Sequence, residues 1–341
     1  MRPAAGGRLL ALALALLCTP FPLAAAEPVP VVAAPVSAFE PQHPETTQFG
    51  PLRFLCGLQI DSPDSRFGGL SGLEISPDGS TILMVSDLGD LFHGRIETAA
   101  DGSLTGLTDV TRQRLPGQDG KPLTDKYAAD AESLRAIRDE GKLEALLVGF
   151  ERDNRILRYP VVSPNPDGPP KLGTPTALPL PAEAARLPYN KGFEAVAVLP
   201  EDTSIVAFAE SVVAEGDTAI PGYLITPAGT RDLALARTDG FDVTDAVALD
   251  TGDLLILERR FNILLGVAMR LRRISADALA GPQPMTGEVL FTAGMAYAID
   301  NMEGLAVHSD GDGRTILTLV SDDNFSALQR TLLLQFELLR K

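Results

Sequence analysis

A segment of alternating apolar residues occurs five times in this chain of 341 residues, at intervals of 51 to 62 residues. Each copy starts with a polar residue, continues with a small or polar residue, and then alternates apolar side chains. The polar position holds Ser71, Glu132, Glu194, Asp245 and Glu303. Alternation with a period of two predicts a strand with one buried face. A strand unit repeated at this interval is typical of a β-propeller, in which equivalent strands surround one axis.

A second apolar strand follows each copy and ends in an acidic residue. The ends of these strands are Asp87, Glu151, Glu210, Glu258 and Asp322. Turn sequences, such as Asp-Gly-Asp-Gly over 310–313, separate the two strands of a unit. Further apolar runs follow each pair, so one unit supplies a blade of several strands. The sequence therefore predicts an all-β fold, a single β-propeller with five visible repeats.

The last unit has only three clear strands. An apolar run over 52–60 precedes the first unit, and we expect this N-terminal strand to pair with the C-terminal blade. Such pairing would close the ring and leave no exposed sheet edge. A stretch over 159–188 is too rich in proline for central strands. It could be a long connection or a linker between two domains, and a degenerate sixth blade could lie within 155–190.

Residues 1–26 have the pattern of a secretory signal peptide. Two arginines precede an apolar run over 9–18, and Ala24 and Ala26 provide a small-residue cleavage site. The run is short for a membrane span, although an uncleaved anchor stays an alternative. We expect an exported protein, periplasmic or secreted, with a flexible segment over 27–49 and the propeller domain over 50–341. Without residues 1–26, Cys56 would be the only cysteine, which predicts a core without disulfides.

The formal net charge is −16. A field of this sign repels nucleic acid and anionic lipid. We therefore expect no nucleic-acid partner and no insertion into a membrane after signal cleavage, and we expect a monomer. The field would also repel an anionic substrate unless metal ions lie between the protein and that substrate.

Equivalent positions in the innermost strands of a propeller meet around the central channel. The repeat frame therefore gathers four carboxylates, those of Glu132, Glu194, Asp245 and Glu303. Protonation, arginine or a hard cation could relieve their mutual repulsion. Ca²⁺ prefers six to eight oxygen ligands, whereas zinc and copper prefer the histidine and cysteine that this chain nearly lacks. The sequence predicts a Ca²⁺ site, with structural hydrogen bonding of the same acids as the alternative.

The ends of the second strands carry both signs of charge. Glu151 is followed by Arg152, and Glu258 is followed by Arg259. An arginine here could neutralise the carboxylates or hold an anionic group through two hydrogen bonds. We take these four residues, with Asp87 and Asp322, as the candidate catalytic group.

These motifs together resemble a known family. The segments are FGGLSGLEISPDGSTILMVSDLGDLF, NKGFEAVAVLP, DLLILERRF and NMEGLAVH, which begin at residues 67, 190, 253 and 301. They are similar to the phytase-like family called "esterase-like activity of phytase", a bacterial, mostly exported group related to β-propellers. The resemblance spans roughly 50–340 and implies ester or phosphodiester hydrolysis by recurring acidic residues. The matching positions are Asp87, Glu132, Glu151, Glu194, Glu258, Glu303 and Asp322, accompanied by Arg152 and Arg259; Ser71 has no acid where other repeats do.

Hydrolysis would follow from hard-cation chemistry. Ca²⁺ would polarise a phosphoryl or acyl oxygen and acidify a bound water, an arginine would stabilise the developing anion, and a carboxylate would take the proton. Two alternatives stay open: a periplasmic propeller that binds a small ligand or a protein without turnover, and a lactonase that uses the same axial metal.

Overall fold

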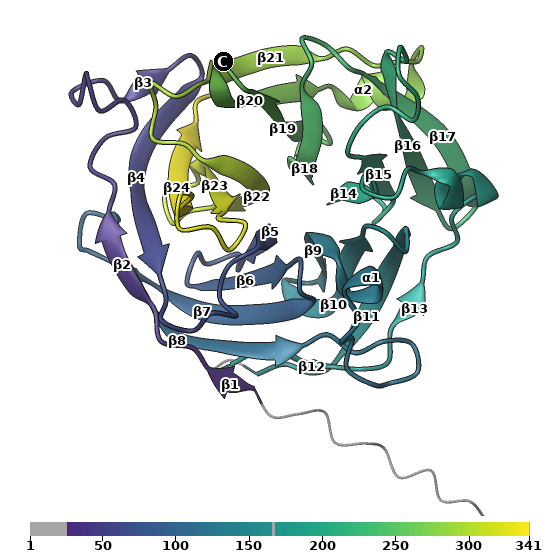
Figure 1. Ribbon diagram of the computed structural model, residues 1–341, viewed down its shortest axis with the longest axis horizontal. Coiled ribbons are helices and arrows are strands. Elements are labelled where there is room, and N and C mark those ends of the chain that lie inside the picture. Colours follow the sequence, from purple (N-terminus) through teal and green to yellow (C-terminus); the bar gives the residue numbers. More distant parts are fainter. Residues whose placement is uncertain (1–25, 166–167, 341) are drawn as a thin grey trace, which may run out of the picture.

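The computed structural model describes residues 26–165 and 168–340, so the predicted signal peptide lies outside the described residues except for Ala26. The strands in this part of the chain form five antiparallel sheets arranged around one axis, as Figure 1 shows. The protein is therefore an all-β, five-bladed β-propeller, and the predicted fold class is confirmed. No sixth blade occurs among the described residues.

The blades follow one another along the chain from their innermost strands outward. The first contains β5 (Leu70–Ile75), β6 (Thr81–Ser86), β7 (Asp90–Thr98) and β8 (Leu104–Arg114), with β1 (Glu27–Pro28) at its outer edge. The second contains β9 (Ala131–Asp139), β10 (Lys142–Phe150) and β11 (Arg155–Ser163), with β12 (Lys171–Leu172) and β13 (Thr176–Ala177). The third contains β14 (Phe193–Val198), β15 (Ile205–Ala209), β16 (Ala219–Thr226) and β17 (Gly229–Ala236).

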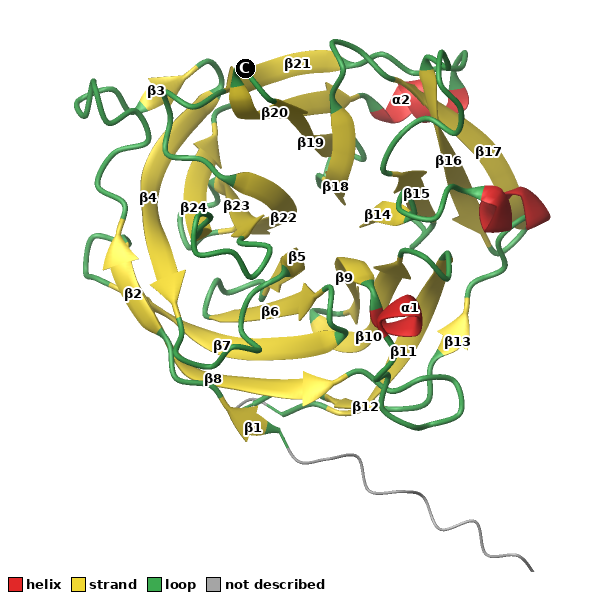
Figure 2. Cartoon of the chain, in the orientation of Figure 1, coloured by secondary structure: helices red, strands yellow, loops and turns green. Residues whose placement is uncertain are grey.

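The last two blades have the same arrangement. The fourth contains β18 (Asp242–Ala248), β19 (Leu254–Asn262), β20 (Gly266–Ile274) and β21 (Glu288–Ala293). The fifth contains β22 (Asn301–Ser309), β23 (Thr315–Asp322), β24 (Thr331–Leu338) and β4 (Leu52–Asp61), with β2 (Val32–Pro35) and β3 (Gln48–Phe49). β4 pairs antiparallel with β24, so the fifth sheet combines strands from both ends of the chain. In the described part of the chain, three short helices lie in connections: α1 (Lys126–Ala129), η1 (Ala182–Arg186) and α2 (Ala276–Ala280), drawn in red in Figure 2.

The apolar core fills the spaces between neighbouring blades. In β6, Ile82 and Met84 pack toward the fifth blade, whereas Leu83 and Val85 pack toward the second. Successive side chains of a strand point to opposite faces, and both faces of an inner strand are buried here. This explains why the second strands of the blades, such as β6, have continuous apolar sequences.

The segment 27–49 is packed against the ring and does not match the flexible segment that we expected. β2 pairs with β4, and Phe39 is completely buried. The Phe39 ring lies 5.1 Å from that of Phe49 and 4.9 Å from that of Phe336, measured between ring centroids. An aromatic cluster of this kind buries much apolar surface. Phe336, like Phe291 and Tyr297, comes from a distant part of the chain, so the local sequence does not reveal the cluster.

The proline-rich stretch 159–188 completes the second blade. Its two short strands, β12 and β13, both pair with β11, and η1 follows them. The stretch is therefore mostly a connection, as its proline content predicted, and it contributes edge pairing rather than a separate blade. Within the described residues, no helix combines the length and the apolar character that crossing a membrane requires.

Every innermost strand begins with a β-bulge, a single extra residue that has no partner in the neighbouring strand. The extra residues are Ser71, Glu132, Glu194, Thr244 and Glu303. A bulge bends its strand and redirects the side chain of the extra residue. In four of the five blades, the repeated polar position of the sequence is therefore the position at which the inner strand turns a side chain toward one end of the axis.

One arginine crosses the axis below these bulges. Arg135, from β9, has a side chain that is 3% exposed. Its guanidinium donates hydrogen bonds to the carbonyl oxygens of Leu73 in the first blade (3.1 Å), Ala246 in the fourth (2.6 Å) and Leu305 in the fifth (2.8 Å). It also forms a 2.6 Å salt bridge with Asp245. One side chain therefore connects four blades and fills the middle of the channel.

Replacing Arg135 with Met should lower the free energy of unfolding by about 3–5 kcal/mol, because the change leaves the Asp245 carboxylate buried without its partner. Urea unfolding would measure this loss. Arg138→Met, in the same strand but half-buried, should change the value by less than about 1 kcal/mol. The double variant Arg135→Met/Asp245→Asn should lose less than the sum of the single changes. Equal losses for Arg135→Met and Arg138→Met would contradict the structural role.

Candidate functional site

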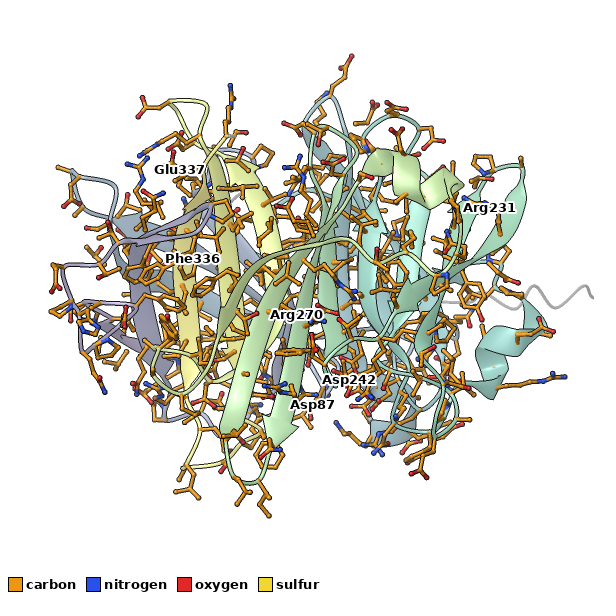
Figure 3. All side chains as sticks on the ribbon, turned by 90° about the horizontal axis from the view of Figure 1, so that it is seen from above. Asp87, Arg231, Asp242, Arg270, Phe336 and Glu337 are labelled. Carbon is orange, nitrogen blue, oxygen red and sulfur yellow. The ribbon has the colours of Figure 1, made fainter. Side chains whose placement is uncertain are left out.

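The bulged side chains open into a pocket of about 290 Å³ at one end of the axis. It is lined by Ser71, Asp87, Lys126, Asp130, Glu132, Glu151, Arg152, Asn190, Glu194, Glu210, Arg259, Glu303, Asp322 and Asn324. The lining thus holds eight carboxylic acids and three basic side chains. Figure 3 views the ring from the side, with Asp87 toward the end that carries the pocket and Glu337 toward the other.

Two sets of equivalent positions build this pocket. The first set is the five bulges, although Thr244 does not reach the lining. In each blade, the residue before the bulge pairs with a residue of the neighbouring strand, and the second set is the residue that follows this partner. Its members are Asp87, Glu151, Glu210, Arg259 and Asp322. Both sets gather because each blade repeats the same register around the axis. The pocket is therefore a direct product of the repeat.

Eight of the ten predicted site residues line this pocket, and two do not. Asp245 and Glu258, both in the fourth blade, lie outside it. The bulge of this blade falls on Thr244, one residue earlier than the repeat frame predicted. Because the side-chain period of a strand is two, a shift of one residue turns both acids to the other face of their strands.

These two acids have structural partners instead. Asp245 is completely buried and binds Arg135, while its second oxygen accepts a 2.7 Å hydrogen bond from the backbone N–H of Leu305. Glu258 is also completely buried and forms salt bridges with Arg270 (2.6 Å) and Arg272 (2.5 Å). In the fourth blade, Thr244 therefore takes the bulge position and Arg259 takes the position of the second set. Arg259 is a cation, whereas the other four blades have an acid at this second position.

Several lining residues were absent from the predicted site. Asp130 and Lys126 come from α1 and the residue after it, Asn190 precedes β14, and Glu210 follows β15. Glu210 could have been chosen, since it ends a second strand in the repeat frame. Asp130 lies two residues before Glu132, and no periodic signal marks it, because it belongs to a connection between blades.

The basic side chains neutralise only part of the acidic lining. Lys126 lies 2.7 Å from Asp87 and 2.5 Å from Asp130, which also pairs with Arg152. Arg259 lies 2.9 Å from Glu303 and 3.3 Å from Glu210.

Four lining acids remain without a salt bridge among the described residues: Glu132, Glu151, Glu194 and Asp322. Oxygen atoms of Glu151 lie within 4.8 Å of oxygens of two groups, Asp130 with Glu132 and Glu194 with Glu210. Glu303 is 7% exposed, and its Oε2 atom is buried without a hydrogen-bond partner in the described structure. An unpaired buried carboxylate oxygen is costly. The arrangement has the donor set of a cation site, centred on Glu151.

Burial and mutual repulsion raise the pKa values of these acids. Burial, followed by the charges of Asp130 and Glu210, raises the pKa of Glu151 to about 7. Burial also raises the pKa of Glu210 to about 7, although Arg259 opposes the shift. The pKa of Asp322 rises to about 8 through burial and the charge of Glu303. Perturbed acids of this kind concentrate at functional sites.

The pKa values of Glu132 and Glu194 also lie well above the usual range for a glutamate. Burial is the main cause for both, and the charges of neighbouring carboxylates add to it. Together, these shifts make the pocket a region that favours either bound protons or a bound cation.

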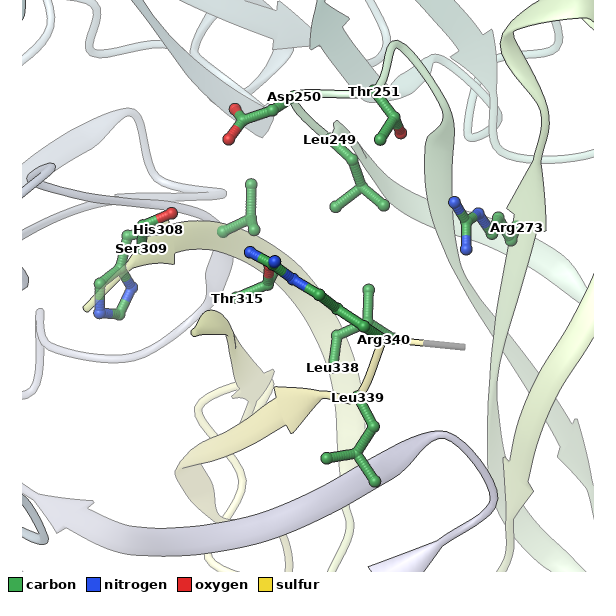
Figure 4. Close-up of a pocket in the computed structure, with 11 residues that line it drawn as sticks. Leu249, Asp250, Thr251, Arg273, His308, Ser309, Thr315, Leu338, Leu339 and Arg340 are labelled. Atoms are coloured by element: carbon green, nitrogen blue, oxygen red, sulfur yellow. The ribbon is translucent and has the colours of Figure 1, made fainter. Parts of the chain in front are cut away.

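The other end of the axis has a different character. A cavity of about 440 Å³ lies there between the fourth and fifth blades, and Figure 4 shows its lining. Among the described residues that line it, Asp250 is the one acid, accompanied by Arg273 and Arg340. Arg273 is already paired with Asp253 at 2.5 Å. This cavity therefore lacks the clustered acids of the pocket at the opposite end, and we take that acidic pocket as the candidate site.

The fold and the site define this chain as a β-propeller with repeated acids around its axis. The family described as "Phytase-like: Esterase-like activity of phytase" matches residues 65–325. The chain belongs to this family. A search of curated proteins found no match.

Two solved structures have a related shape. One is an α-L-arabinofuranosidase from Podospora anserina in complex with cellotriose, with 13% identity, a TM-score of 0.49, and coverage of 81% of this chain and 93% of that one. The other is a bifunctional GH43-CE protein of Bacteroides eggerthii, with 15% identity and a TM-score of 0.46. That match covers 80% of this chain but only 33% of the other, so this chain corresponds to about a third of its length.

Raised carboxyl pKa values predict a stability that falls as pH rises. The folded protein holds protons that the unfolded chain releases above about pH 4.5, so folding becomes less favourable up to the folded pKa values of about 7 to 8. In EDTA, the melting temperature should therefore decrease between about pH 5 and pH 8. Glu151→Gln should flatten this decrease and raise the melting temperature at pH 8 by a few degrees.

Glu144→Gln, an exposed position on β10, is the matched control and should leave the pH profile unchanged. A flat profile for the wild-type chain between pH 5 and pH 8 would contradict the raised pKa values.

Proposed function

We propose that this protein is an exported ester or phosphoester hydrolase that holds a divalent cation, Ca²⁺, in the acidic pocket. The observation that carries the proposal is the group of unpaired acids around Glu151, whose oxygens approach those of four other acids within 4.8 Å. Family membership supports hydrolysis as the reaction class. Export to the periplasm or the medium and a monomeric state complete the proposal.

The lining fits a hard cation. Eight of the described residues that line the pocket are carboxylic acids, and none of these lining residues is a histidine or a cysteine. Ca²⁺ is bound by six to eight oxygen atoms in flexible geometry. Glu132, Glu151 and Glu194 would hold the ion, with Asp130 or Glu210 beside them. Two of the four predicted ligands, Glu132 and Glu194, belong to this set. Asp245 does not line the pocket, and Glu303 pairs with Arg259.

When bound, the cation would draw electron density from an acyl or phosphoryl oxygen and would lower the pKa of water. Arg259 lines the pocket and is held by Glu303 and by a 2.6 Å hydrogen bond to Asn301 Oδ1. A guanidinium fixed in this way can stabilise negative charge that develops on the substrate. Asp322, with a pKa of about 8, carries a proton at neutral pH and can donate it to the leaving oxygen.

The other predicted catalytic residues have supporting roles in this proposal. Arg152 binds Asp130 and donates a 2.8 Å hydrogen bond to Tyr189 Oη, so it orients an acid beside the cation site. Asp87 accepts from Lys126 and forms one wall of the pocket. Glu258 stabilises the fourth blade through its two arginines rather than acting on substrate.

Ca²⁺ titration and a substrate screen test this proposal together. Every described strand lies within 27–338, so a chain that begins at Ala26 keeps all five blades. After EDTA treatment, saturating Ca²⁺ should raise its melting temperature by roughly 5–10 °C. Aryl phosphates, phosphodiesters, carboxyl esters and lactones should be tested with Ca²⁺ and with EDTA, and hydrolysis of at least one class should depend on Ca²⁺.

Glu194→Gln should reduce both the Ca²⁺ response and the activity at least about tenfold, whereas Glu144→Gln should preserve both. Glu303→Gln should lower activity through Arg259. A Ca²⁺ response without hydrolysis of any class would favour a non-catalytic binding propeller, and activity on lactones alone would favour a lactonase. No Ca²⁺ response and no hydrolysis would refute the proposal.

A further inference from the structure

The hairpin of β19 and β20 ends in an exposed apolar tip. Phe261 is 70% exposed, Ile263 and Leu264 are each 88% exposed, and Leu265 is 69% exposed. Three of these side chains are consecutive in the sequence. Single exposed apolar residues are common on protein surfaces, but a contiguous group of large ones marks a contact surface.

Hydrogen bonds within the tip satisfy two of its backbone N–H groups. Asn262 Oδ1 accepts hydrogen bonds from the N–H groups of Leu264 (2.9 Å) and Leu265 (3.1 Å). Strand pairing continues up to Asn262 and Gly266, where a φ of +74° allows the turn to close. The tip therefore satisfies polar groups internally that would otherwise oppose entry into an apolar phase.

The tip lies at the same end of the propeller as the acidic pocket. Arg259, two residues before Phe261 in β19, lines the pocket itself. Most of the other exposed large apolar residues also lie in connections at this end; they are Tyr127, Tyr189, Val213, Met295, Phe325 and Leu328. This end thus combines an acidic centre with an apolar periphery.

We propose that the tip 261–265 inserts into the surface of a zwitterionic lipid layer and places the acidic pocket over the headgroups. A projecting hairpin suits insertion, whereas a small ligand needs a concave site. Zwitterionic headgroups present an outer ammonium group, which complements the acidic pocket, while the net charge of −16 opposes an anionic layer. Shallow contact by one turn is not membrane spanning, and a zwitterionic layer lacks the net negative charge on which we based the expectation of no membrane insertion.

This inference goes beyond the proposed function and does not depend on hydrolysis. A chain without ester hydrolysis could still bind lipid through the tip, and an active hydrolase could fail to bind it. The alternative partner of the tip is the same tip of a second copy of this chain, since such a contact would also bury Ile263 and Leu264. The experiment separates these two occupants.

The chain contains no tryptophan, so one introduced indole reports on one place. Leu264→Trp reports on the tip, and Val162→Trp is the matched control, because Val162 is 63% exposed at the far end of β11. Both variants would be made in the chain that begins at Ala26 and titrated with phosphatidylcholine vesicles. We expect a blue shift of the Leu264→Trp emission and quenching by brominated lipid, with neither effect for Val162→Trp.

Sedimentation with vesicles gives an independent measurement. Ile263→Ser/Leu264→Ser should reduce partitioning onto phosphatidylcholine at least about tenfold, because two exposed aliphatic side chains would no longer enter the lipid. Val162→Ser should leave partitioning unchanged, and phosphatidylserine should weaken it. Equal behaviour of the tip and control variants would overturn the proposal. A blue shift that depends on protein concentration without vesicles, together with a dimer that Ile263→Ser/Leu264→Ser dissociates, would assign the tip to a second copy and also overturn it.

Discussion

The contact of Arg135 with four blades is the interaction on which the geometry of the acidic pocket depends. A propeller blade is a separate sheet, and the hydrophobic effect that packs blades together is not directional. Hydrogen bonds from one guanidinium to carbonyl oxygens of Leu73, Ala246 and Leu305 fix the inner strands at a common depth. Because the bulged residues lie only a few positions away on those strands, the same contact fixes where the acids meet.

Arg135 also divides the channel into two separate ends. Its guanidinium and Asp245 fill the middle of the axis, and both are nearly or completely buried. The acids of one end are therefore not connected with the cavity that contains Asp250 at the other. Burial of these carboxyl groups keeps their pKa values high, whereas a wide water-filled channel would screen them. The buried ion pair thus contributes to the chemistry of the pocket as well as to the ring.

The sequence predicted the architecture well and the fourth blade badly, and both outcomes have a physical cause. Five copies of one alternating pattern determine the class of fold. The pattern does not reveal which residue bulges, because Val-Thr-Asp-Ala-Val aligns equally well with Thr244 or with Asp245 in the polar position. The spacing offered a clue: from Asp245 to Glu258 it is 13 residues, but from Thr244 to Arg259 it is 15, nearer to the 16 to 19 of the other units. No local pattern predicts the burial of Phe39, since three of its ring partners, Phe291, Tyr297 and Phe336, are remote in sequence.

The two ends of the propeller differ because of the kind of connection that each one carries. At the far end, the innermost strand of each blade returns through a short polar turn, as in 310–314 between β22 and β23. At the pocket end, the chain crosses from one blade to the next and also turns from second to third strands, so longer connections such as 115–130 and 210–218 surround the axis. Longer loops tolerate varied side chains without disturbing the blades. An acidic centre and an apolar rim can therefore coexist at this end, while the bulges supply the centre and the hairpin of β19 and β20 supplies part of the rim.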